Sequence, residues 1–133
     1  TSLTPVGVFM GCSYTDPNTN QKTSNQQFPA STAASDIMAY VLDDPRVLMR
    51  MQGDATLAQT TLGNNVAVVQ TAGSTSIGRS KNAVDSSTVA TTNTLPLRII
   101  DFVDGPTSTV GDAFTDVIVK FNVGHIYENT TGI

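Results

Sequence analysis

The sequence predicts an all-β protein, an antiparallel β-barrel or β-sandwich with at most one or two short helices. Its apolar residues fall in short runs, and clusters of Gly, Pro, Asn, Asp and Ser separate these runs. Threonine is frequent, and its branched side chain favours strands. The runs follow one another without the long helical segments that a parallel α/β sheet requires.

The predicted strands are the apolar runs, taken in chain order. They cover residues 6–14, 37–42, 47–51, 67–71, 97–103 and 116–123. In the last run Val117, Val119, Phe121 and Val123 alternate with Ile118 and polar residues, which predicts one buried face.

Turn residues define the connections between these strands. Residues 16–21, DPNTNQ, predict a polar hairpin tip, and residues 43–46, DDPR, predict a hairpin or a strand kink. One helix of at most two turns is expected within residues 55–65, because Gly63 and two asparagines follow its leucines and end the pattern.

Residues 73–80, GSTSIGRS, differ from the nucleotide-binding pattern G-x-x-x-x-G-K-[ST] only at Arg79, which replaces lysine. A phosphate loop works because its amide groups lie at the start of a helix. The residues that follow are instead poor in helix formers, and arginine is not equivalent to the loop lysine. We therefore predict a flexible loop between strands, without nucleotide binding.

Asp16, Asn18 and Asn20 match the first positions of a calcium loop. The pattern fails at Gln21, where glycine is needed for the turn, and at Gln27, where a bidentate glutamate is needed. No metal site is predicted here.

The remaining acidic residues also fit turns better than catalysis or metal binding. Asp43 and Asp44 are adjacent, so in a strand they point to opposite faces, and Pro45 favours an Asx-type turn. A second acidic set surrounds the DGP turn, with spacing that matches no metal signature. Its members are Asp101, Asp104, Asp112 and Asp116.

No catalytic residue or cofactor is predicted. His125 is the single histidine, lies beside a polar tail, and is expected to be exposed. Cys12 is the single cysteine and is expected to be a small buried side chain. Residues 129–131 match the glycosylation acceptor pattern, which is meaningful only on a secretory route.

Length and charge limit the class of protein further. A chain of 133 residues predicts a single domain over residues 1–133. Charged residues make up 14% and the net charge is −4, which argues against a nucleic-acid partner. No apolar run is long enough to span a membrane as a helix.

Several segments, in their order, resemble a family of small structural proteins of tailed bacteriophages, especially marine phages. The family shares a G-V-F-x-G-C-x-Y segment, a Y-V-x-D-D-P segment followed by apolar residues and Q-x-D or Q-G-D, a G-S-T-x-x-G loop and an L-R-I strand. In this chain they start at Gly7, Tyr40, Gly73 and Leu97, and the likeness covers nearly the whole sequence. Family members usually carry a further portion before the first segment, so we expect this chain to be the C-terminal part of a longer one.

The resemblance implies a virion component on the outer capsid surface. The expected function is that of a non-enzymatic decoration (cement) protein, whose partner is the major capsid protein. A phage tail or receptor-binding β-module and a minor head structural protein are the alternatives.

The chain ends are the predicted interface, since they mix apolar and polar residues with few charges. We expect a homo-oligomer, with a trimer favoured, whose ends add to neighbouring sheets. The candidate residues are Thr4, Pro5, Val6, Ile126, Tyr127 and Ile133.

Overall fold

The computed structural model of the chain describes residues 4–122, 125, 127 and 128. These residues form strands and loops with one 3-10 helix, which confirms the predicted all-β class. No helix in the described part is long and apolar enough to cross a membrane. The strands are β1 (Val8–Thr15), β2 (Lys22–Asn25), β3 (Met38–Leu42), β4 (Leu48–Gln52), β5 (Asn65–Val69), β6 (Ala83–Ala90), β7 (Leu97–Phe102) and β8 (Asp116–Phe121).

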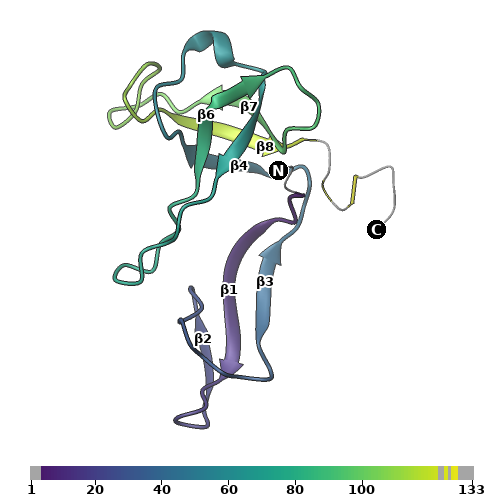
Figure 1. Cartoon of the computed structure of the whole chain (residues 1–133), viewed down its shortest axis with the longest axis vertical. Coiled ribbons are helices and arrows are strands. Elements are labelled where there is room, and N and C mark those ends of the chain that lie inside the picture. Colours follow the sequence, from purple (N-terminus) through teal and green to yellow (C-terminus); the bar gives the residue numbers. More distant parts are fainter. Residues whose placement is uncertain (1–3, 123–124, 126, 129–133) are drawn as a thin grey trace. The chain divides into compact units, whose positions relative to one another are not determined.

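The strands form two antiparallel sheets, with orders β2-β1-β3 and β4-β8-β7-β5-β6 (Figure 1). Residue contacts divide the chain in the same way. The three-strand unit comprises Val6–Asp43 and Ala72–Lys81, and the five-strand unit comprises Thr1–Pro5, Asp44–Thr71 and Asn82–Ile133. The single domain expected from the chain length stays a prediction.

Strand β8 lies inside the five-stranded sheet, paired with β4 on one side and β7 on the other. Its Val117, Val119 and Phe121 are buried, which confirms the predicted alternation as far as the described residues extend. Side chains from neighbouring segments complete the apolar core. They are Leu57, Val66, Val84, Leu97, Ile99 and Phe102.

The two edge strands of this sheet approach each other at one end. Gly53, which follows β4, forms a parallel bridge with Val84 of β6. The backbone N–H of Gly53 donates to the carbonyl of Thr115 at 2.8 Å, and that of Asp54 donates to the carbonyl of Val84 at 2.9 Å. The bridge joins the two edges at this point, but the sheet is not closed into a barrel.

Strand β6 was not predicted, because its sequence is mostly polar. Its pairing with β5 jumps from Asp85 to Ala90, so the residues between them bulge out. The Thr88 hydroxyl accepts a hydrogen bond from the N–H of Ala67 at 2.9 Å, in place of a strand carbonyl. Polar side chains therefore replace part of the main-chain ladder here.

Residues 43–46 were predicted to form a hairpin or a strand kink, and the hairpin is wrong. Strand β3 pairs with β1, whereas β4 pairs with β8, so the segment leads from one sheet into the other. The predicted Asx-type turn is confirmed, since the N–H of Arg46 donates to the Asp44 carboxylate at 2.8 Å.

The expected helix within residues 55–65 is a single 3-10 turn, Gln59–Thr61. The chain leaves it at Gly63, whose φ of +81° suits glycine. The short helix agrees with the predicted upper limit.

Thr115 provides a test of how the five-strand unit is held together. Its buried hydroxyl accepts from the N–H of Leu57 at 3.1 Å and donates to the carbonyl of Asp112 at 3.0 Å. Thr115→Val should lower the free energy of unfolding by about 1–3 kcal/mol, because the buried N–H of Leu57 loses its acceptor. Chemical denaturation measures the change. Thr107→Val, at an exposed position of the same loop, is the control and should change stability little.

Candidate interaction surface

Strand β1 organises the three-strand unit, because it pairs with β2 on one side and β3 on the other. Two main-chain hydrogen bonds close the connection between β1 and β2. The N–H of Asp16 donates to the carbonyl of Gln21, and the N–H of Asn20 donates to the carbonyl of Asp16. Asn18 also donates its N–H to the Asp16 carboxylate at 2.8 Å. The predicted polar hairpin tip is confirmed, and these bonds explain its aspartate and asparagines.

A bulge bends β1 where it pairs with β3. The register shifts between Phe9 and Gly11, so that Met10 is the extra residue. Gly11 has a φ of +144°, and a side chain there would approach the carbonyl oxygen of Asn25 to 3.0 Å. This position therefore requires glycine.

One side of β1 is covered by the segment that follows β2. Cys12 and Tyr14 are buried there, which confirms the expectation for the cysteine. The Tyr14 hydroxyl accepts from the Asn25 side-chain amide at 3.0 Å, and its ring meets Phe28 edge-on. The Cys12 thiol donates to the carbonyl of Gln27 at 3.6 Å, so the local structure accounts for the cysteine.

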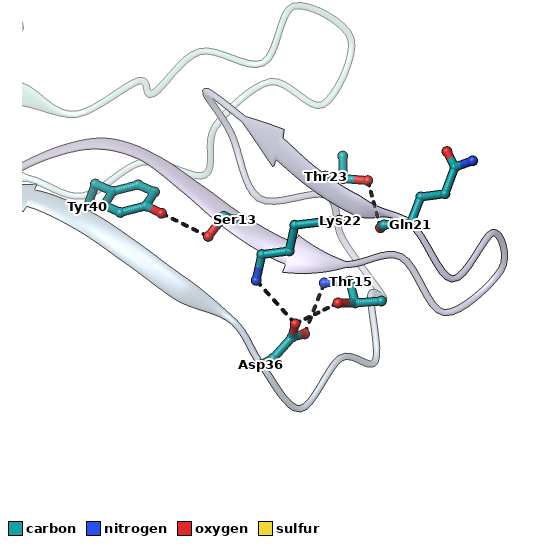
Figure 2. A network of polar contacts seen from close by, with 7 residues as sticks. All are labelled: Ser13, Thr15, Gln21, Lys22, Thr23, Asp36 and Tyr40. Atoms are coloured by element: carbon teal, nitrogen blue, oxygen red, sulfur yellow. Dashed lines mark hydrogen bonds and ion pairs between the residues drawn. The ribbon is translucent and has the colours of Figure 1, made fainter.

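The other side of β1 carries a polar network (Figure 2). The Asp36 carboxylate accepts from the hydroxyl of Thr15 at 2.6 Å, from the Thr15 N–H at 2.9 Å, and from the ammonium of Lys22 at 3.3 Å. The bonds from Thr15, with a smaller effect of Lys22, lower the pKa of Asp36 from 3.8 to about 2. The network fastens the chain entering β3 onto β1 and β2.

Strand β3 is exposed at every position, although its sequence contains no charged residue. Its tyrosine is fixed by a hydrogen bond of 3.0 Å between the hydroxyls of Tyr40 and Ser13 (Figure 2). Large apolar side chains are exposed on β3 and at other positions of its unit. Within the three-strand unit they are Val6, Phe9, Met10, Phe28, Ile37, Met38, Tyr40, Val41, Leu42 and Ile77.

Among the sheet edges, β3 alone lacks a feature that discourages pairing. Strand β2 is short and begins with Lys22, β4 carries Arg50 at its centre, and β6 is bulged. Natural proteins protect edges by such charges, short lengths and bulges. Strand β3 forms the outer edge of its sheet (Figure 1) and offers an uncharged backbone with apolar side chains on both faces.

We missed this surface in the sequence, because an unbroken apolar run predicts burial on both faces. The residues that we did predict as an interface are partly described. Thr4 and Val6 are exposed, Pro5 is half-buried, and Tyr127 is 63% exposed. Ile126 and Ile133, like residues 129–131, lie outside the described residues.

The expectation that His125 is exposed is wrong. Its side chain is fully buried, with its ring 5.1 Å from that of Phe121 and 5.6 Å from that of Tyr127. The N–H of Tyr127 donates to Nδ1 of His125 at 3.2 Å. Aromatic packing thus extends the core beyond β8, which the polar sequence around His125 concealed.

Three members of the second acidic set make hydrogen bonds or an ion pair in the five-strand unit. Asp112 accepts from the N–H and the hydroxyl of Thr109, and Asp101 accepts from the N–H of Phe102. Asp116 forms an ion pair with Arg50. No group of three potential metal ligands occurs in the described part of the chain. The contacts of Asp112 agree with the turn interpretation. For Asp101, which lies in β7, and Asp116, which begins β8, that interpretation is wrong.

The segment GSTSIGRS connects β5 to β6, as the loop interpretation predicts. The N–H of Ser74 donates to the carbonyl of Arg79 at 3.0 Å, and the N–H of Gly78 donates to the carbonyl of Ser74 at 2.8 Å. A strand follows where a phosphate loop requires a helix. The loop is therefore closed by its own main-chain hydrogen bonds. The N–H groups of Ser74 and Gly78 already have acceptors within the loop, so they are not available to a phosphate.

The three-strand unit is therefore suited to binding another polypeptide chain. An unpaired main-chain edge can receive a further strand, and apolar side chains on both faces can be buried against it. Figure 2 shows that Asp36, which precedes β3, forms an ion pair with Lys22.

The Asp36 network predicts a specific acid sensitivity. Because the folded pKa lies below the value of 3.8, the carboxylate stabilises the fold above about pH 3.8 and loses this effect as pH falls toward 2. The wild type should therefore lose stability in this window, and Asp36→Asn should lose less of it. Unfolding measured as a function of pH tests this. If both proteins lost the same unfolding free energy between pH 3.8 and 2, Asp36 would contribute nothing to the acid sensitivity.

The loop interpretation predicts that Arg79→Ala leaves the fold unchanged, within about 0.5 kcal/mol of unfolding free energy. The backbone carbonyl of Arg79, which the substitution keeps, makes the turn. Thermal unfolding and nucleotide titration measure the two expectations. ATP binding that the variant abolishes would contradict the loop interpretation.

No protein-family model matches the chain, and neither the curated proteins nor the solved structures contain a significant match.

Proposed function

We propose that the protein is a non-enzymatic component of a virion, a capsid decoration protein that binds the assembled shell of the major capsid protein and stabilises it. The order of its sequence segments, which resembles that of small tailed-phage structural proteins, supports this assignment. The resemblance also supports a location on the outer capsid surface.

The observation that carries the proposal is apolar surface left exposed on a protein with few charges. Val6 is 50% exposed and Tyr127 is 63% exposed, and Leu48 and Phe114 are 58% and 59% exposed. Exposed apolar side chains of this size gain free energy when another molecule buries them. A protein that contacts several neighbours on a capsid lattice would bury such side chains at several places along its chain.

Stabilisation of a shell follows from binding alone. A protein that binds only the assembled shell shifts the equilibrium away from rupture by mass action. When it binds as a homo-oligomer, several modest contacts combine, because the first contact raises the effective concentration of the others. The proposal therefore requires no catalytic group and no special motif.

Capsids that lack the protein provide the test. Purified protein should bind them at regular positions and raise the temperature at which they rupture. Binding only to tails, or to the head at the portal, would instead favour a receptor-binding module or a minor head protein. Cryo-electron microscopy locates the protein in each case.

The chain ends are expected to contact the shell. The double variant Val6→Ser, Tyr127→Ser should bind capsids at least about tenfold more weakly, because each lost apolar contact costs about 1 kcal/mol or more. Ile77→Ser, which changes an apolar loop residue that is 66% exposed, is the matched control. Unchanged occupancy by the double variant would show that the ends are not the contact.

A further inference from the structure

We infer that β3 pairs with β3 of a second copy of this chain, antiparallel and about a two-fold axis at Tyr40, to form a continuous six-stranded sheet across the dimer. The inference concerns the chain's own assembly and stands apart from capsid binding. It rests on the composition of β3, on its place at a sheet edge, and on the charges around it.

The first argument is that β3 is complementary to itself. Antiparallel pairing about Tyr40 places Met38 opposite Leu42 of the second copy, and Ala39 opposite Val41. All five residues of the strand then face apolar or aromatic residues, and such cross-strand pairs stabilise sheets. A two-fold contact requires this kind of self-complementary patch.

The second argument is that the charges at both ends of β3 fix its register. Moving the axis to Val41 would place Asp43 opposite Ala39, inside the apolar stretch. Moving it to Ala39 would place Asp36 opposite Leu42. Only the register centred on Tyr40 keeps both carboxylates outside the five paired residues, and Asp36 is already neutralised by Lys22.

The third argument is that the three-strand unit carries no net charge. Its acidic residues are Asp16, Asp36 and Asp43, and its basic residues are Lys22, Arg79 and Lys81, so three of each cancel. The net charge of −4 of the whole chain therefore belongs to the five-strand unit. Two copies can join through the neutral unit without net repulsion between the joined surfaces.

The fourth argument is the amount of apolar surface. Ile37, Met38, Tyr40, Val41 and Leu42, together with Phe9 on the neighbouring strand, are each between 40% and 59% exposed. A standard stable interface buries about 800 Å² on each partner. Half-exposed side chains of this size supply roughly 80 Å² each, so these six supply roughly 480 Å², a little over half of that area. Main-chain hydrogen bonds between the two edges add to this apolar contribution.

The mass of the full chain in solution is the first test. Sedimentation equilibrium should give twice the 14.0 kDa of one chain. A monomer at concentrations of tens of micromolar would overturn the inference. A trimer would also overturn it, and would agree instead with the oligomer expected from the sequence resemblance.

A cross-linking pair tests the register. With Cys12→Ser as the background, Tyr40→Cys should form a disulfide between two copies, because the axis places residue 40 opposite itself. Met38→Cys is the matched control: residues 38 of the two copies would lie about 13 Å apart along the sheet, which a disulfide cannot span. Equal cross-linking of both variants, or none in Tyr40→Cys, would overturn the pairing.

Substitution of the edge supplies an independent measurement. Val41→Lys should raise the dimer dissociation constant at least about tenfold, because it places a charge within the paired edge. Ile77→Lys, at a 66% exposed loop position of the same unit, should leave it unchanged. A Val41→Lys protein that dimerises like the wild type would contradict the inference. If this variant does not fold, as judged by circular dichroism, the cross-linking pair decides.

Discussion

The alternation of side chains along β8 is the constraint on which the five-strand unit depends. Val117, Val119 and Phe121 must face one side together, because a strand places every second residue on the same face. Both neighbours of β8 take their register from it, and a slip by one residue would expose all three side chains. The loop before β8 is fixed in turn by Thr115, which joins it to the segment containing Leu57.

Hydrogen bonds of uncharged groups replace ion pairs in much of this protein. Charged residues make up only 14% of the chain, and only two ion pairs occur among the described residues. Hydroxyl and amide side chains join neighbouring strands, as in the contacts of Thr88 with Ala67 and of Asn25 with Tyr14. Such contacts depend little on salt, because no full charge is screened.

The sequence predicted the strands with clear apolar runs, because burial of one face leaves a period of two. It did not predict β6, in which Val84 is the single fully buried side chain. The rest of this strand is held in part by hydrogen bonds of side-chain hydroxyl groups. Pairing was less predictable still. The contact of Arg50 with Asp116 spans 66 residues, and nothing local in either segment specifies the other. His125 was misjudged for a similar reason, because its burial depends on Phe121 rather than on its polar neighbours.

The exposure of β3 was unpredictable on the same grounds. An apolar run indicates that a strand is stabilised by burial. It does not indicate whether residues of the same chain or of another molecule pack against the strand. In this fold β1 covers one edge of β3 and the described chain leaves the other open. The candidate surface thus follows from topology, which local sequence does not encode.

The three-strand unit is discontinuous in sequence, since residues 72–81 belong to it although they lie between β5 and β6. The backbone therefore passes between the two units at four places. Neither unit can be excised as one stretch of gene, and a fragment ending before residue 72 would lack part of both. Recombination that exchanged the three-strand unit for that of another protein would need two simultaneous insertions, and the five-strand unit would need three. The two units are therefore expected to be inherited together.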